Sequence, residues 1–164
     1  MHRPSSVSAL TIGRIDVSPG TLEALVRAEP AFACTSASPG LAQRALALLP
    51  GLARHTCENG TSHGMIAELS ATETPHLLEH VAVECMALSG SPRSLRAETR
   101  WDFAVDGPNV YRVRLAYDID LVALGSLREG VHIVDWLMGL PAEKPDIASI
   151  VAGLCEVRAG AAAS

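Results

Sequence analysis

Two histidines and a glutamate stand close together in one short stretch of the chain, as His76, Glu79 and His80. Residues four apart on a helix lie on the same face, with Cβ atoms about 6 Å apart, so the two imidazoles can hold one metal ion from one side. Imidazole nitrogen is a common zinc ligand. Glu79 lies about 100° around the helix from His80, and its carboxylate can take a proton from a water molecule at the metal. The order H-x-x-E-H therefore predicts zinc-dependent hydrolysis.

A structural role fits the same spacing. A helix that carries two half-buried histidines and a solvated glutamate needs no metal, and the pattern alone favours neither interpretation. The chain offers two candidates for a third ligand beside His76 and His80. One is Cys57 in a preceding loop, because thiolate sulfur is a strong zinc donor. The other is Glu84, one turn after His80, which can equally pair with an arginine.

Local signals place the elements that carry these residues. Thr74 and Pro75 predict the start of a helix, with the Thr74 hydroxyl as N-cap and the proline where its missing N–H is not needed. Gly90 predicts its end, as a C-terminal cap. Residues 52–64 are polar and punctuated by glycine, which predicts a loop that brings histidine and cysteine side chains in front of the helix.

Strand-like and helix-like segments are mixed along the whole chain, which predicts an α+β domain with helices packed on a mostly antiparallel sheet. Turn residues 106–109 between two strand-like segments predict a hairpin. We see no linker or repeat, so one domain over 1–164 is expected, with the last few residues frayed. Cys34 is expected to be a small core residue. The expected strands cover 7–17, 31–36, 65–69, 95–105 and 110–117, and the expected helices cover 18–30, 41–49, 74–90, 131–140 and 146–157.

Composition excludes several classes of protein. The chain has 164 residues, of which 48% are hydrophobic and 19% charged, and its net charge is −5. These values are typical of a globular protein, and no basic run offers a site for nucleic acid. No segment has the length and apolarity of a membrane span or the pattern of a signal peptide. The four cysteines show no C-x-x-C spacing, which favours reduced thiols and a cytoplasmic location.

Several motifs occur in order between residues 49 and 117. They are LPGLARHTCENG (49–60), HLLEHVAVECMALSG (76–90), ETR (98–100) and NVYRVRLAY (109–117). Their order and spacing resemble those of the N-terminal domain of cyanophycin synthetase. The ATP-grasp and Mur-ligase-like parts of that family are not present in this sequence, so polymer synthesis is not expected.

The resemblance implies the fold of H-x-x-E-H metallohydrolases, the inverzincins, which S-ribosylhomocysteine lyase also resembles. It implies a zinc ion held by His76, His80 and Cys57, with Glu79 as the catalytic base. Arg100 matches the family's x-T-R element and can bind a substrate carboxylate or form a structural salt bridge. The loop histidines His55 and His63 can contact the ligands or the substrate, or remain solvated.

The implied activity is zinc-dependent hydrolysis of amide or peptide bonds, on Asp-Arg peptides like cyanophycin or on related small peptides. Two alternatives remain open. One is a non-catalytic module that binds peptide or polymer and keeps the fold and a metal, and the other is lyase chemistry with the same metal ligands. The expected partner is a peptide or small-molecule substrate, with neither nucleic acid nor membrane, and relatives of this fold suggest a homodimer.

Overall fold

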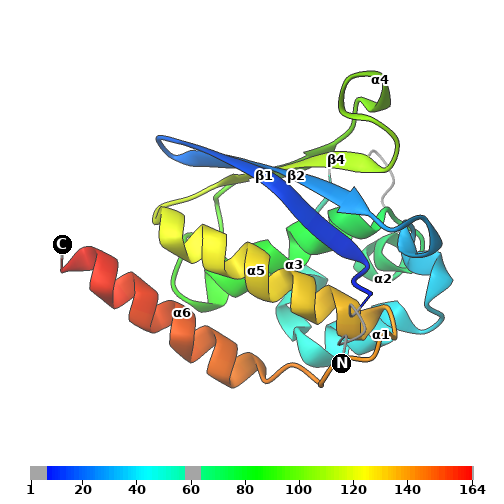
Figure 1. Ribbon diagram of the computed structural model, residues 1–164. Coiled ribbons are helices and arrows are strands. Elements are labelled where there is room, and N and C mark those ends of the chain that lie inside the picture. The colour runs from blue at the N-terminus through cyan, green and yellow to red at the C-terminus, as the bar shows by residue number, and fades with distance from the viewer. Residues whose placement is uncertain (1–6, 58–63, 164) are drawn as a thin grey trace, which may run out of the picture.

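The computed structural model of the protein describes residues 7–57 and 64–163. Four strands form an antiparallel sheet in the order β1-β2-β4-β3, which confirms the α+β class and the antiparallel sheet. Figure 1 shows α3 and α5 beside each other under one face of the sheet, with α6 on their far side. The strands are β1 (Leu10–Ser18), β2 (Thr21–Ala28), β3 (Ala97–Arg100) and β4 (Val110–Ala116). The helices are α1 (Leu41–Leu48), α2 (Gly64–Ser70), α3 (Thr74–Leu88), α4 (Phe103–Asp106), α5 (Asp120–Leu137) and α6 (Ile147–Ala162).

The expected strand over 7–17 and helix over 41–49 correspond to β1 and α1. The helix expected after Ser18 is wrong, because this segment is the second strand of a hairpin. Ser18 and Thr21 pair across a turn of Pro19 and Gly20, and Gly20 has a φ of 75°. Proline followed by a residue with positive φ is typical of a type II turn. The buried side chains of β2 alternate and belong to Leu22, Ala24, Val26 and Ala28. The apolar residues of this segment therefore follow the two-residue period of a strand.

The strand expected over 31–36 is also wrong. The segment forms two short 3-10 helices, η1 (Pro30–Phe32) and η2 (Thr35–Ala37). Proline at the start of η1 favours a helical φ. Between them, Cys34 is extended and forms an isolated bridge with Glu73. Its side chain is exposed, so the expectation of a core cysteine is wrong as well.

The apolar run over 65–69 is helical and not a strand, because it lies in α2. Met65 and Leu69, four residues apart, are both buried, whereas Ile66 between them is exposed. Ala67 is also exposed, although on a strand it would share the face of Met65 and Leu69, so the burial follows the period of a helix and not of a strand.

Helix α3 begins at Thr74 as expected, but threonine is not its N-cap. Glu73 holds that position, and its side chain makes no capping hydrogen bond; the buried Thr74 hydroxyl instead donates to the carbonyl of Phe32. Pro75 lies in the first turn as expected. Gly90, with a φ of 104°, follows the last turn and lets the chain leave the helix. The start of α3 is therefore anchored by a contact with a distant segment.

The two C-terminal helices are longer than expected. Helix α5 begins at Asp120 rather than at residue 131, and its glycines do not interrupt it. A Cβ on Gly130 would lie 2.8 Å from Cδ1 of Leu78, so this glycine allows α5 to pack closely on α3. Helix α6 begins after its N-cap Asp146, as expected, but extends through Ala162, where a frayed tail was expected.

The expected hairpin is present, since β3 pairs with β4 in antiparallel register. Its first strand, however, ends at Arg100 rather than at Val105, and α4 fills much of the connection. The Asp102 carboxylate accepts hydrogen bonds from the backbone N–H groups of Ala104 and Val105. This local cap favours a helical turn over continued strand pairing.

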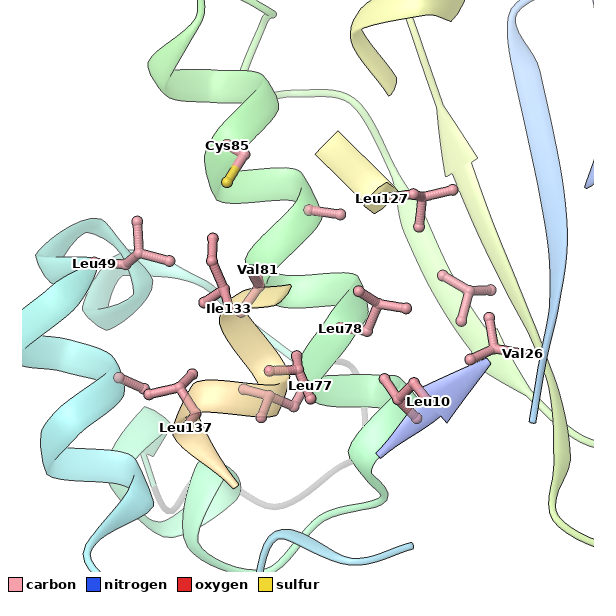
Figure 2. Packing of buried hydrophobic residues seen from close by; sticks show 14 of the residues in the cluster. Leu10, Val26, Leu49, Leu77, Leu78, Val81, Cys85, Leu127, Ile133 and Leu137 are labelled. Atoms are coloured by element: carbon pink, nitrogen blue, oxygen red, sulfur yellow. The ribbon is translucent and has the colours of Figure 1, made fainter. Parts of the chain in front are cut away.

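The core lies between the sheet and the pair α3 and α5. Figure 2 shows Leu10 and Val26 from the strands facing Leu78 of α3 and Leu127 of α5. Cys85 of α3 is fully buried in the same cluster. None of the described helices is long and apolar enough to cross a membrane.

Because Leu78 is fully buried at the contact between α3, α5 and the sheet, we expect Leu78→Ala to lower the free energy of unfolding by about 2–5 kcal/mol. Urea denaturation of the metal-free protein measures this loss. Leu121→Ala is the matched control, since Leu121 is 53% exposed on α5 and its truncation should change stability by less than about 0.5 kcal/mol. Equal losses in the two variants would contradict the packing described here.

Candidate metal centre

Three side chains converge on one point beside the first turns of α3. The Sγ atom of Cys57 lies 3.0 Å from Nε2 of His80 and 3.7 Å from Nε2 of His76, and the two Nε2 atoms are 3.1 Å apart. The two histidines come from one face of the helix, as their spacing predicted, and the cysteine comes from the loop after η3 (Pro50–Arg54). The structure therefore places the three predicted metal ligands together.

The donor set fits a zinc ion. Tetrahedral coordination at the bond lengths of zinc to sulfur and nitrogen spaces neighbouring donors about 3.3–3.6 Å apart, close to the distances among these three atoms. One sulfur and two imidazole nitrogens are also the soft and borderline donors that zinc prefers. Cys57, His76 and His80 therefore fit zinc by chemistry and by spacing.

The electrostatics of the cluster favour a cation among these atoms. Burial lowers the pKa of His80 to about 3, so its imidazole is neutral, which is the form that binds metals. Burial, followed by the charges of Glu68 and Glu79, raises the pKa of the Cys57 thiol to about 11. A metal ion bound here would stabilise the thiolate, because its positive charge opposes both effects.

Each histidine is oriented through its other ring nitrogen. Nδ1 of His76 lies 2.8 Å from Oγ1 of Thr72 and 3.5 Å from a carboxylate oxygen of Glu68. Nδ1 of His80 lies 3.0 Å from Nδ1 of His55. These contacts turn the Nε2 atoms toward Cys57.

Glu84, the second candidate for the third ligand, lies away from this point. Its Oε2 is 2.8 Å from Nε2 of His55, and Arg93 binds both of its carboxylate oxygens, at 2.9 and 3.2 Å. Burial alone would raise the pKa of Glu84, but the hydrogen bonds from His55 and Arg93 hold it at about 2. His55 itself is largely buried and contacts a metal-ligand candidate, so it is not a solvated loop residue.

Glu79, the predicted base, is buried one residue before His80 and faces the same cavity. Its Oε2 accepts a hydrogen bond of 2.6 Å from Oγ1 of Thr99. Burial raises the pKa of Glu79, while the hydrogen bond from Thr99 and the nearby His76 act in the opposite direction. A carboxyl group with a raised pKa is suited to proton transfer near neutral pH.

The three donors and Glu79 open into a cavity of about 1230 Å³ between α3, β3 and the loop after η3. Charges of both signs surround it. The arginines of its lining are Arg54, Arg93, Arg96 and Arg114, and the glutamates besides Glu79 are Glu73 and Glu98. Trp101 adds an aromatic wall.

The two residues predicted to bind substrate are His63 and Arg100. His63 lies outside the described residues. Arg100 is not part of the cavity lining, and its Nη2 pairs instead with Oε2 of Glu23 at 3.0 Å. Thr99, one position earlier, contacts Glu79, because successive side chains of a strand face opposite sides. The alternation of half-buried and exposed positions along β3 separates Thr99 from Arg100.

An H-x-x-E-H helix with a convergent loop cysteine, packed under an antiparallel sheet, defines the class as an α+β domain with a candidate metal centre. A model of the cyanophycin synthase-like N-terminal domain family matches residues 24–139. This range is more than half of the chain and includes every residue of the centre, so the protein belongs to that family. A comparison with curated proteins gave no match.

Proposed function

We propose that the protein is a zinc-dependent hydrolase of amide or peptide bonds. The observation that carries the proposal is the convergence of Cys57, His76 and His80 beside the buried Glu79 at the edge of an open cavity. A purely structural zinc site typically has four protein ligands. Within residues 7–57 and 64–163, three donors lie next to a cavity, an arrangement typical of a catalytic zinc site, which keeps one position for water or substrate.

Cys57, His76 and His80 would hold the ion. When bound, zinc supplies a Lewis acid that polarises a carbonyl oxygen and makes a water molecule more acidic. The protein itself contributes the orientation of the ligands and the shielding of the site from solvent. His80 and Glu79 are both buried, which strengthens electrostatic interactions at this end of the cavity.

Glu79 moves the proton in this proposal. Its Oε2 is held by Thr99, so the other carboxylate oxygen is available to the cavity. That oxygen accepts a proton from the attacking water as the new C–O bond forms at the scissile carbonyl. It then delivers the same proton to the amine nitrogen as the C–N bond breaks, so Glu79 returns to its starting state.

The walls of the cavity favour a peptide that carries both charges. Arg54 forms no ion pair within the described part of the chain and is exposed, so it is available to a substrate carboxylate. Glu73 and Glu98 can pair with a substrate guanidinium or ammonium group. Short peptides of aspartate and arginine, the composition of cyanophycin, fit this pattern and the family of the protein.

Elemental analysis and a peptide assay test the proposal. The purified protein should contain a stoichiometric amount of zinc and should release new amino groups from Asp-Arg polymer or Asp-Arg dipeptides, but not from neutral peptides of equal length. Protein without stoichiometric metal would contradict the proposal. Zinc-loaded protein that binds the polymer without cutting it would instead support a binding module, for which the large cavity with charges of both signs is also suited.

A further inference from the structure

We propose that Arg93, Glu84 and His55 act as positioning residues that fix the tautomer of His80, so that its Nε2 carries a lone pair toward Cys57 and His76. The inference rests on the proposed metal centre, but it concerns residues that do not contact the metal-binding point. Each step follows from which atom of a contact donates the hydrogen bond and which accepts it.

The series of hydrogen bonds begins at the carboxylate of Glu84, which can only accept hydrogen bonds. The Glu84 side chain is 1% exposed, and the guanidinium of Arg93 donates to both of its oxygens. An ionised carboxylate has no proton to give. Its contact of 2.8 Å with Nε2 of His55 therefore requires the proton of that contact to lie on the histidine.

The proton on Nε2 of His55 decides the next contact. The proposal requires the neutral form of His55, in which the one N–H is on Nε2, so that Nδ1 bears a lone pair and can only accept. It lies 3.0 Å from Nδ1 of His80, which must then be the donor. With its single proton on Nδ1, His80 has a lone pair on Nε2, 3.0 Å from Sγ of Cys57 and 3.1 Å from Nε2 of His76.

The backbone around Glu84 is shaped to keep its carboxylate in place. A Cβ on Gly51 would lie 1.8 Å from Oε1 of Glu84, so only glycine allows η3 to pack directly on the carboxylate. The same turn leads to His55, which reaches back over α3. His76 is oriented separately, through Thr72, so the two histidines can be perturbed one at a time.

Long-range ¹H–¹⁵N NMR of the metal-free protein at neutral pH tests the tautomer directly. We expect His80 to carry its proton on Nδ1 in the wild type. In Glu84→Gln and His55→Leu we expect part or all of the population to carry the proton on Nε2. A wild-type His80 protonated on Nε2, or a His80 tautomer that stays as in the wild type in both variants, would overturn the inference.

Zinc affinity, measured by competition with a chromophoric chelator, provides the second readout. Loss of a residue that orients a metal-binding histidine typically lowers affinity about 10- to 100-fold, and we expect this loss in Glu84→Gln and His55→Leu. His55→Asn should recover part of it, because its amide oxygen can replace the Nδ1 acceptor, which a purely structural role of His55 would not explain. Gly51→Ala, which displaces Glu84 without changing it, should weaken binding similarly, and Glu156→Gln on the exposed face of α6 should not.

The two proposals fail in different ways. Wild-type affinity in Glu84→Gln, His55→Leu and Gly51→Ala, with normal circular dichroism, would overturn the role of these residues and leave the metal centre intact. If the wild type itself binds no zinc, the proposed function fails, and the tautomer measured in the metal-free protein still decides whether this chain of hydrogen bonds orients His80.

Discussion

Glu79→Gln is expected to lower amide hydrolysis by about 10²- to 10⁴-fold while zinc stays bound. Glutamine has the size of glutamate and can still accept a hydrogen bond from Thr99, so the geometry of the cavity is preserved. It cannot take up the proton of the attacking water, which is the step assigned to Glu79. Glu79 also lies outside the cluster of three donors, so its replacement should not remove a ligand.

The measurement pairs initial rates on an Asp-Arg peptide with the zinc content of the same preparation. Glu84→Gln is the contrasting variant, because we expect it to lower zinc affinity rather than the rate of the zinc-loaded protein. Excess zinc should therefore restore most of its activity. Excess zinc should restore nothing in Glu79→Gln. Undiminished hydrolysis by zinc-loaded Glu79→Gln would exclude this residue as the base.

His80→Ala is expected to abolish specific zinc binding, with a loss of affinity greater than the 10- to 100-fold effect of an orienting residue. His80 lies at the centre of the cluster, since its Nε2 contacts both Sγ of Cys57 and Nε2 of His76. Its removal leaves two of the three donors that the described residues supply, which are too few for a closed or a catalytic zinc site.

The zinc-dependent shift in melting temperature measures this effect without an activity assay. A ligand at 100 times its dissociation constant stabilises the native state by about 2.7 kcal/mol, so zinc should raise the melting temperature of the wild type. His132→Ala is the matched control, because His132 is exposed on α5, and it should keep the full shift. The metal-free melting temperatures can differ, since His80→Ala also removes a buried side chain. A zinc-dependent shift in His80→Ala as large as in the wild type would show that the ion binds elsewhere.

Local sequence signals predicted the elements that depend on neighbouring residues. The proline start and glycine end of α3, the strand β1 and the helix α1 follow from turn residues and periodicity within a few positions. Errors arose where a local signal has two structural meanings. Ser18 and Pro19 can begin a helix or a turn, and Gly20, with its positive φ, supports the turn. The decision came from pairing with β4, which is some ninety residues away, at Thr21↔Ala116.

In the candidate site, too, local sequence predicted some features and contacts between distant segments decided others. The sequence by itself determined that His76, Glu79 and His80 share the first turns of one helix, because side chains at that spacing meet on any α-helix. The family resemblance of its loop motif favoured Cys57 over Glu84 as the third donor. Only the tertiary structure decided that Glu84 binds Arg93 and His55 instead of a metal, and that Thr99 rather than Arg100 reaches Glu79. These contacts join segments far apart in the chain, and burial between α3, η3 and β3 selects one partner for each polar group, since an unpaired polar group there would be costly.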